Sequence, residues 1–160
     1  MRIIETKIYQ FDELTEAAKQ KAIEWARDIM TYDPAGCHES LQSIKAFCEH
    51  FQVELENWSV DAYGYYFNAC RENDGFRGLK LSQFTGQEMP TGYCLDCSLW
   101  ETFYKMIKET GDAKRAFNDA LDAGFKAWRD DLASQLEDDY LIDFIQANEY
   151  EFTEKGKIYD

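Results

Sequence analysis

The opening of the chain constrains its fold most, because a short alternating segment leads directly into an amphipathic helix. Residues 2–10 alternate apolar and polar side chains, as a strand does. Residues 15–30 carry apolar side chains at three- and four-residue spacing and therefore predict a helix. Thr15 is the expected N-cap, since its hydroxyl can accept a hydrogen bond from a free N–H group of the first turn. A strand followed by its own covering helix indicates an α+β fold.

Four more helices are predicted from apolar periodicity, over residues 39–52, 95–110, 113–138 and 139–147. Cys48 lies on the apolar face of the first of these and is predicted to be a core residue. Trp25 in the opening helix and Trp128 in the long helix lie on apolar stripes, and we expect both to be buried.

The middle and the end of the chain predict antiparallel strands. Residues 58–67 are dense in aromatic and β-branched side chains and predict one strand. A turn at 72–75 would return the chain into a partner strand at 76–81, and residues 150–159 predict a terminal hairpin. We therefore expect a single α+β domain over residues 1–160, with a small antiparallel sheet covered by several helices, a long acidic C-terminal helix and a terminal hairpin.

Composition and the absence of targeting segments favour a folded, cytoplasmic protein. Among 160 residues, 45% are hydrophobic and 16% aromatic, which is enough for a sizeable core. No run of about 18 apolar residues is present, so we expect no membrane span. The N-terminus has no apolar segment of the signal-peptide kind, and we expect a cytoplasmic location.

The charge balance restricts the partners. Thirty-one acidic residues stand against seventeen basic ones, for a net charge of −14. Phosphate contacts require Lys and Arg, so we expect no direct binding to DNA, RNA or an anionic membrane. A protein of this charge can instead bind a basic surface.

The long helix carries the most suggestive acidic surface. At 100° per residue, four acids lie within about 20° of one another, opposite the apolar stripe: Asp112, Asp119, Asp130 and Glu137. Four carboxylates over about 38 Å of helix are far sparser than the one charge per about 1.7 Å of duplex DNA. Mimicry of DNA would therefore need a homodimer or the acids that follow in sequence, which include Asp138, Asp139, Asp143, Glu149 and Glu151. The alternative is a solvated helix face.

Aromatic side chains would have to supply the specificity that charge alone does not give. Tyr63 and Tyr65, close to the turn at 72–75, are the expected anchors for a partner. The sites predicted for partner binding are therefore these two tyrosines together with the acids Asp112, Asp119, Asp130, Glu137, Asp138 and Asp139.

The cysteines offer a weaker alternative. Cys94 and Cys97 form a CxxC pair, and a zinc site would need two further ligands from Cys37, His38, Cys48 and His50. The spacing between Cys37 and Cys48 matches no zinc knuckle, and the CxxC pair lacks the βαβ context of a redox motif. No nucleophile motif accompanies either histidine. We therefore expect reduced thiols, no metal, no cofactor and no enzymatic activity.

Two segments carry a resemblance to known proteins. Residues 8–22, IYQFDELTEAAKQKA, resemble the start of a group of small acidic proteins encoded by phages and prophages, and residues 147–159, ANEYEFTEKGKIY, resemble their end. Some members of that group are labelled antitoxins. The resemblance implies a phage accessory protein, and such proteins are often inhibitors of host defence.

Charge and resemblance together favour one function. We expect an inhibitor of a bacterial defence system, of the anti-CRISPR or anti-restriction kind, that places its acidic surface on a basic host protein or nucleoprotein complex. The alternatives are an antitoxin-like binding protein and a small zinc or thiol protein that uses Cys94 and Cys97.

Overall fold

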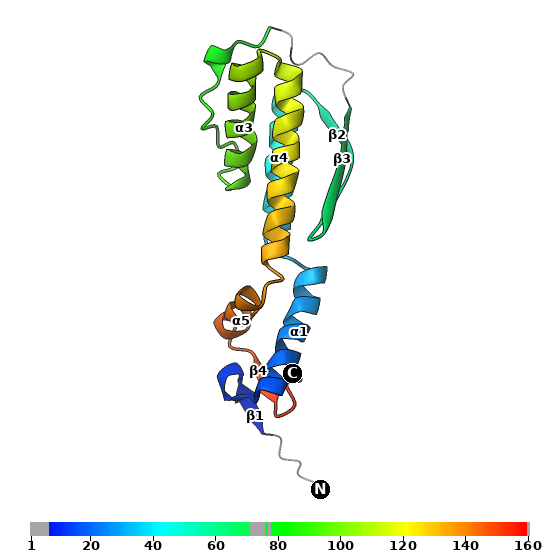
Figure 1. Cartoon of the computed structure of the whole chain (residues 1–160), viewed down its shortest axis with the longest axis vertical. Coiled ribbons are helices and arrows are strands. Elements are labelled where there is room, and N and C mark those ends of the chain that lie inside the picture. The colour runs from blue at the N-terminus through cyan, green and yellow to red at the C-terminus, as the bar shows by residue number, and fades with distance from the viewer. Residues whose placement is uncertain (1–6, 71–75, 77, 160) are drawn as a thin grey trace. The chain divides into compact units, whose positions relative to one another are not determined.

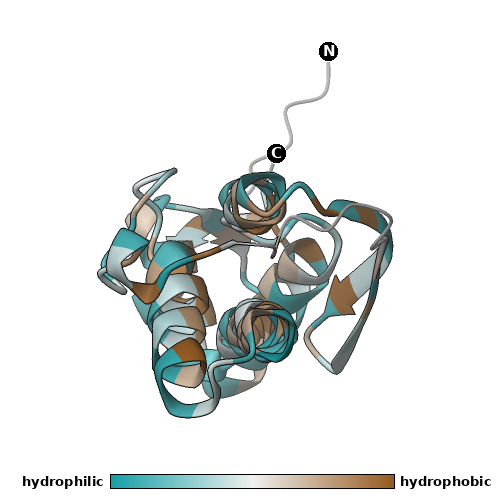
Figure 2. Cartoon of the chain, turned by 90° about the horizontal axis from the view of Figure 1, so that it is seen from above, coloured by the Kyte–Doolittle hydropathy of each residue, from teal (hydrophilic) through white to brown (hydrophobic). Residues whose placement is uncertain are grey.

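The computed structural model describes residues 7–70, 76 and 78–159, and these form an α+β fold, as predicted (Figure 1). The helices are α1 (Glu16–Tyr32), α2 (Cys37–His50), α3 (Leu95–Thr110), α4 (Ala113–Ser134) and α5 (Asp138–Ala147). The strands are β1 (Ile8–Gln10), β2 (Glu54–Asp61), β3 (Gly64–Cys70) and β4 (Glu151–Thr153). Figure 2 shows both hydrophilic and hydrophobic residues on the helices, as is typical of amphipathic helices.

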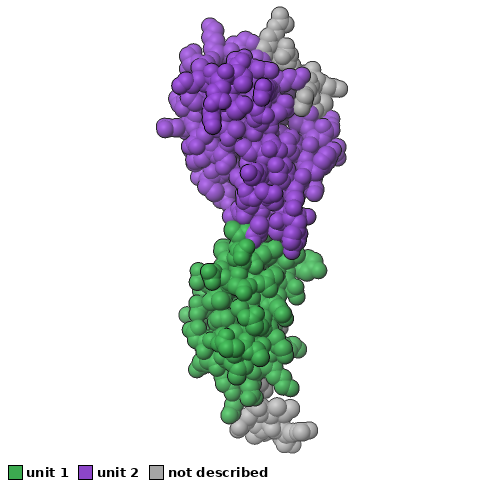
Figure 3. Space-filling view, in the orientation of Figure 1, with its two compact units in different colours: residues 1–35, 134–160 green, residues 36–133 purple. Residues whose placement is uncertain are grey.

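The chain divides into two compact units (Figure 3). The first unit contains residues 1–35 and 134–160, and the second contains residues 36–133. The first unit is therefore assembled from both ends of the chain, whereas the second is one continuous segment. A single domain over residues 1–160 stays a prediction, because compact units of one chain can still unfold cooperatively.

The first unit closes through pairing of its two chain ends. Strand β1 is antiparallel to β4, with Tyr9 opposite Phe152. Phe152 is fully buried, and it also bridges to Ile158, which confirms the predicted terminal hairpin. Helix α1 starts as expected, since the Thr15 hydroxyl accepts a hydrogen bond from the Ala18 N–H at 3.4 Å.

The two tryptophans expected in the core differ in burial. Trp128 on α4 keeps 2% of its surface exposed, as predicted. Trp25 on α1 is only partly buried, and its ring makes edge contacts with Tyr150 and Phe152 at centroid distances of 4.9 and 5.8 Å. The predicted apolar face of α1 is thus the one that packs in the core, but the Trp25 indole remains partly accessible.

The second unit is built around an aromatic core between α2, α3 and α4. Phe47 on α2 stacks on Phe117 of α4, with ring centroids 5.3 Å apart and planes 7° apart. Cys48 is 2% exposed, which confirms its predicted place in the core. Gly124 on α4 allows close packing, since a Cβ atom there would lie 2.4 Å from Leu99 of α3.

The prediction of one strand over residues 58–67 is wrong. This segment contains a hairpin, in which β2 and β3 are joined at Ala62 and Tyr63. The Asp61 carboxylate accepts hydrogen bonds from the N–H groups of Tyr63 and Gly64, at 2.7 and 2.9 Å. An Asp directly before the turn and a Gly directly after it are turn signals, and the surrounding aromatic residues obscured them.

One face of this hairpin packs on α4, which lies between the hairpin and α3 in Figure 1. Phe67 stacks on Phe125 at 4.8 Å, and Trp58 contacts Trp128 at 5.5 Å. The prediction of a partner strand at 76–81 is also wrong. Phe76 and residues 78–80 belong to no strand, and a 3₁₀ helix begins at Leu81. The turn expected at 72–75 lies outside the described residues.

The long helix ends earlier than predicted, at Ser134 instead of residue 138. Gln135 follows it and is 3% exposed. Its side-chain amide accepts a hydrogen bond from the Ala35 N–H at 2.9 Å and donates one to the Ala35 carbonyl at 3.0 Å. This pairing of Gln135 with Ala35 accounts for the end of α4 at Ser134. Apolar periodicity alone does not predict it. None of the described helices has the length and apolar character that a membrane crossing needs.

The terminal hairpin is pressed against α1 at Gly156. This residue has φ of 75°, and a Cβ atom on it would lie 2.1 Å from the Ala18 carbonyl oxygen. The backbone conformation therefore favours glycine, and the α1 backbone leaves no space for a side chain.

We expect Gly156→Ala to lower the free energy of unfolding more than Gly111→Ala does. Gly111 has a similar φ of 69°, but nothing lies within 4 Å of its missing Cβ. Both substitutions should lose about 1–2 kcal/mol to the left-handed backbone, and Gly156→Ala should lose about 1–3 kcal/mol more to overpacking. Urea denaturation followed by circular dichroism measures the difference. Equal losses would contradict the close packing at Gly156.

Candidate functional site

The acids expected to form one row on the long helix do not form it. Because α4 ends at Ser134, Glu137 is the N-cap of α5 instead of a member of the α4 surface. Asp112 precedes α4, and its carboxylate accepts a hydrogen bond from the Arg115 N–H at 3.0 Å. Asp112 therefore has a capping role, which leaves two acids of the row within the helix itself.

Those two acids lie beside arginines. Asp119 is 3.7 Å from the Arg115 guanidinium, and Asp130 accepts a hydrogen bond from Arg129 Nε at 2.8 Å. Each arginine offsets the charge of its neighbour, so the row presents little net negative potential. Arg115 and Asp119 are one helical turn apart on α4, whereas Arg129 and Asp130 are neighbours in sequence.

The other acidic residues gather at the start of α5. Glu137 occupies the N-cap position, and Asp138 and Asp139 lie in the first turn, where their negative charges interact favourably with the positive end of the helix dipole. Asp138 pairs with Arg27 of α1. Asp143 follows Asp139 by one turn on the same exposed side. Within the described residues, no basic group lies within ion-pair distance of Glu137, Asp139 or Asp143.

Charge is unevenly divided between the two units. The first unit has fifteen acidic and seven basic residues, which is a net charge of −8. The second unit is larger and has sixteen acidic and ten basic residues, which is a net charge of −6. The first unit, which holds the acids of α5, is therefore the more densely charged.

The two tyrosines expected as anchors have different environments. Tyr63 lies at the tip of the hairpin and is 85% exposed. Tyr65 is partly buried, stacks on Phe125 at 6.1 Å and donates a hydrogen bond to Asp122 at 2.9 Å. Burial, followed by the bond to Asp122, raises the pKa of the Tyr65 hydroxyl. Tyr65 thus holds the hairpin on α4, and Tyr63 is the one of the two that is free to contact a partner.

The CxxC segment contains a structural carboxylate that the sequence analysis missed. Asp96, between Cys94 and Cys97, is fully buried. One of its oxygens accepts hydrogen bonds from the N–H and hydroxyl groups of Thr91, both at 2.9 Å, and from the Gly92 N–H at 3.0 Å. Its other oxygen has no hydrogen-bond partner among the described residues. Asp96 therefore fixes the loop that enters α3.

The thiols do not assemble into a metal site in the part of the chain that the structure describes. No three His, Cys, Asp or Glu side chains come together there as a metal ion needs. Cys97 contacts Met89, with the two sulfur atoms 3.5 Å apart. His50 packs its ring against Phe51 and Trp100 at 5.0 and 4.9 Å.

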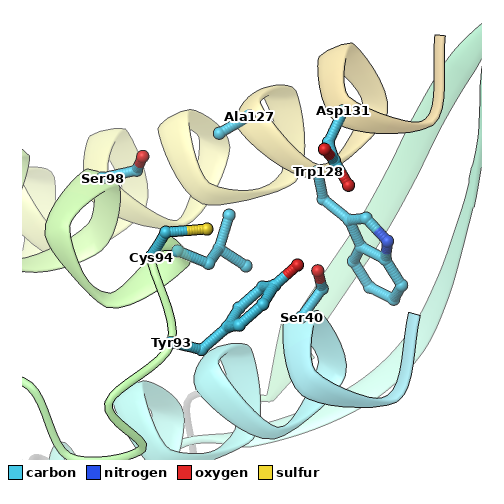
Figure 4. A pocket seen from close by; sticks show the side chains of 8 residues that line it. Ser40, Tyr93, Cys94, Ser98, Ala127, Trp128 and Asp131 are labelled. Carbon is cyan, nitrogen blue, oxygen red and sulfur yellow. The ribbon is translucent and has the colours of Figure 1, made fainter. Parts of the chain in front are cut away.

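A small pocket with several polar side chains in its lining lies between α2, α3 and α4 (Figure 4). Its volume is about 170 Å³, and its lining includes Ser40, Tyr93, Cys94, Ser98, Trp128 and Asp131. Figure 4 shows the hydroxyl groups of Tyr93 and Ser40 pointing toward one another, and these two side chains are hydrogen bonded. Burial raises the pKa of the Tyr93 hydroxyl, and the negative charge of Asp131 raises it further.

This pocket brings together hydroxyls, a thiol and the carboxylate of Asp131, and no histidine lies in its lining. Its volume is also below the range of about 300–1,000 Å³ that is usual for ligand sites. The geometry therefore directs attention to the surfaces of the protein instead of to this pocket.

Comparison of the chain with protein families, with curated proteins and with solved structures found no match.

We expect Asp96→Ala to lower the free energy of unfolding by about 1–3 kcal/mol, since it removes the buried carboxylate that accepts the hydrogen bonds of Thr91 and Gly92. Cys97→Ala is the matched control, because Cys97 is exposed and one residue away. That variant should stay within about 0.5 kcal/mol of the wild type. Chemical denaturation of the three proteins gives the comparison, and an equal effect of both substitutions would contradict a special role of Asp96.

The buried Cys48 should be much less reactive toward alkylating reagents than the exposed Cys94 and Cys97. Burial, with a contribution from Glu49, raises the pKa of the Cys48 thiol to about 12. At pH 8 only about one Cys48 in ten thousand is then a thiolate, the reactive form. We expect brief iodoacetamide treatment to alkylate the exposed Cys94 and Cys97 and to leave Cys48 unmodified until the protein is denatured. Peptide mass spectrometry reads the outcome, and rapid alkylation of Cys48 in the folded protein would refute its burial.

Proposed function

We propose that this chain is an acidic binding protein that inhibits a bacterial defence system by covering a basic, nucleic-acid-binding surface of its target. The uneven distribution of its net charge of −14 is the observation that carries the proposal. The acids at the start of α5 lie in the more densely charged unit, and most of them lack a basic neighbour among the described residues.

Long-range electrostatics gives this surface a physical role. A strongly charged protein attracts an oppositely charged partner before contact and can raise association rates 10-fold or more. The effect weakens as salt is added, because the Debye length falls to about 8 Å at physiological ionic strength. The same charge repels nucleic acid, so the target has to be the protein that holds the nucleic acid.

Exposed aromatic side chains supply a contact surface of a different kind. In the second unit, Trp58, Tyr63 and Tyr66 on the β2–β3 hairpin are exposed by 38%, 85% and 58%. Aromatic residues contribute disproportionately to protein–protein binding. We therefore propose that charge brings the target close and that Tyr63, at the hairpin tip, adds affinity after contact.

A cell-based assay tests inhibition directly. Bacteria with an active CRISPR or restriction system would express the chain and then be challenged with a phage that the system normally blocks. We expect plaque counts to rise at least 10-fold over an empty-vector control, and no change in a host without the defence system. Unchanged plaque counts across a panel of defence systems would exclude this function.

Charge variants then locate the binding surface. The triple variant Glu137→Gln, Asp139→Asn, Asp143→Asn neutralises the unpaired acids of α5 and should slow association with the captured target about 10-fold at low salt. The control Glu54→Gln, Glu101→Gln, Glu109→Gln removes the same charge from exposed positions of the second unit. Association rates measured against ionic strength distinguish the two. Equal rates for both variants would show that only net charge matters.

A further inference from the structure

A second pocket lies in the first unit, between α1 and the terminal hairpin, and three lysines belong to its largely apolar lining although the protein as a whole is acidic. Its volume is about 400 Å³, and its lining consists of Lys21, Trp25, Lys155, Gly156, Lys157 and Ile158. Three of the seven basic residues of this acidic unit therefore line one pocket.

The lysines of this pocket form no ion pair with the described residues. No acidic residue belongs to the pocket lining. Among the described residues, no carboxylate lies within ion-pair distance of Lys21, Lys155 or Lys157. Three lysines without a direct ion pair among the described residues thus meet at one pocket of a unit whose net charge is −8.

The backbone that carries two of the lysines is held firmly. Lys155 and Lys157 flank Gly156, which is pressed against the Ala18 carbonyl. The turn is closed by hydrogen bonds from the Thr153 N–H to the Lys157 carbonyl and from the Gly156 N–H to the Thr153 carbonyl, both 2.8 Å long. The two lysine side chains therefore start from fixed positions on the same side of α1.

Trp25 and Ile158 form the apolar part of the pocket. The indole of Trp25 makes edge contacts with Tyr150 and Phe152, and both of these rings stand at 82° to it. A positioned indole beside several ammonium groups can bind a planar ring and an anion at the same time. Stacking of a base on an aromatic side chain contributes about 1–3 kcal/mol, and lysine binds phosphate as a point charge.

We propose that this pocket binds a small aromatic anion of the nucleoside monophosphate class, with the base against Trp25 and the phosphate near Lys155 and Lys157. The volume lies within the usual range of ligand sites. The negative charge of the surrounding unit disfavours long polyanions such as DNA, whereas a single nucleotide fits inside the basic pocket. This inference does not rest on the proposed inhibition of a defence system.

Isothermal titration calorimetry of the full chain with adenosine monophosphate, adenosine and inorganic phosphate tests the proposal. Adenosine lacks the anion and phosphate lacks the ring, so the nucleotide should bind at least 10-fold more tightly than either. The indole N–H signal of Trp25 in a nitrogen–proton NMR spectrum should shift on addition of the nucleotide. Equal affinity for adenosine and the nucleotide would overturn a role for the lysines.

Matched variants complete the experiment. Lys155→Gln with Lys157→Gln removes two positive charges from exposed positions of the pocket and should weaken nucleotide binding at least 10-fold. Lys105→Gln with Lys108→Gln makes the same change on the exposed side of α3 and should leave the affinity unchanged. Circular dichroism verifies that both variants are folded. Absence of binding at millimolar nucleotide, or equal weakening by both pairs, would show that the lysines only cover apolar surface.

Discussion

The antiparallel pairing of β1 with β4 is the constraint on which the first unit depends. It joins residues near both ends of the chain and places Phe152 in the core between α1 and α5. Everything between these strands forms a closed loop, but the entropy of closure grows only slowly with loop length. The chain can therefore contain a continuous second unit, residues 36–133, between α1 and α5 in sequence, and its two ends can still pair.

Polar side chains fix the places where helices begin and end. Thr15 caps α1, Asp112 accepts a hydrogen bond at the start of α4, and Gln135 pairs with the Ala35 backbone just after α4 ends. Asp96 does the same for the loop before α3. The residues that first suggested chemistry, such as the CxxC segment, thus have a structural explanation. The features that remain available for binding are charge and exposed aromatic surface.

The two kinds of surface proposed to bind ligands follow from how opposite charges are paired. On α4, Asp119 and Asp130 lie beside Arg115 and Arg129, so their fields largely cancel. Among the described residues, Asp138 is the one acid at the start of α5 with such a partner, Arg27. The lysines of the hairpin pocket are likewise unpaired within the described residues. Local pairing, and not the total charge, decides where an acidic protein presents either sign of potential.

Sequence periodicity by itself determined the helices, the α+β class and the burial of Trp128 and Cys48, because an amphipathic pattern has one stable way to bury its apolar side. The turn between β2 and β3 and the ion pairs on α4 join residues close in sequence. Only the tertiary structure decided the end of α4 and the salt-bridge partner of Asp138, because these depend on contacts between residues far apart in sequence, Gln135 with Ala35 and Asp138 with Arg27. The predicted row of acids failed for that reason: a helical projection assumes an unbroken helix, and packing ended the helix at Ser134.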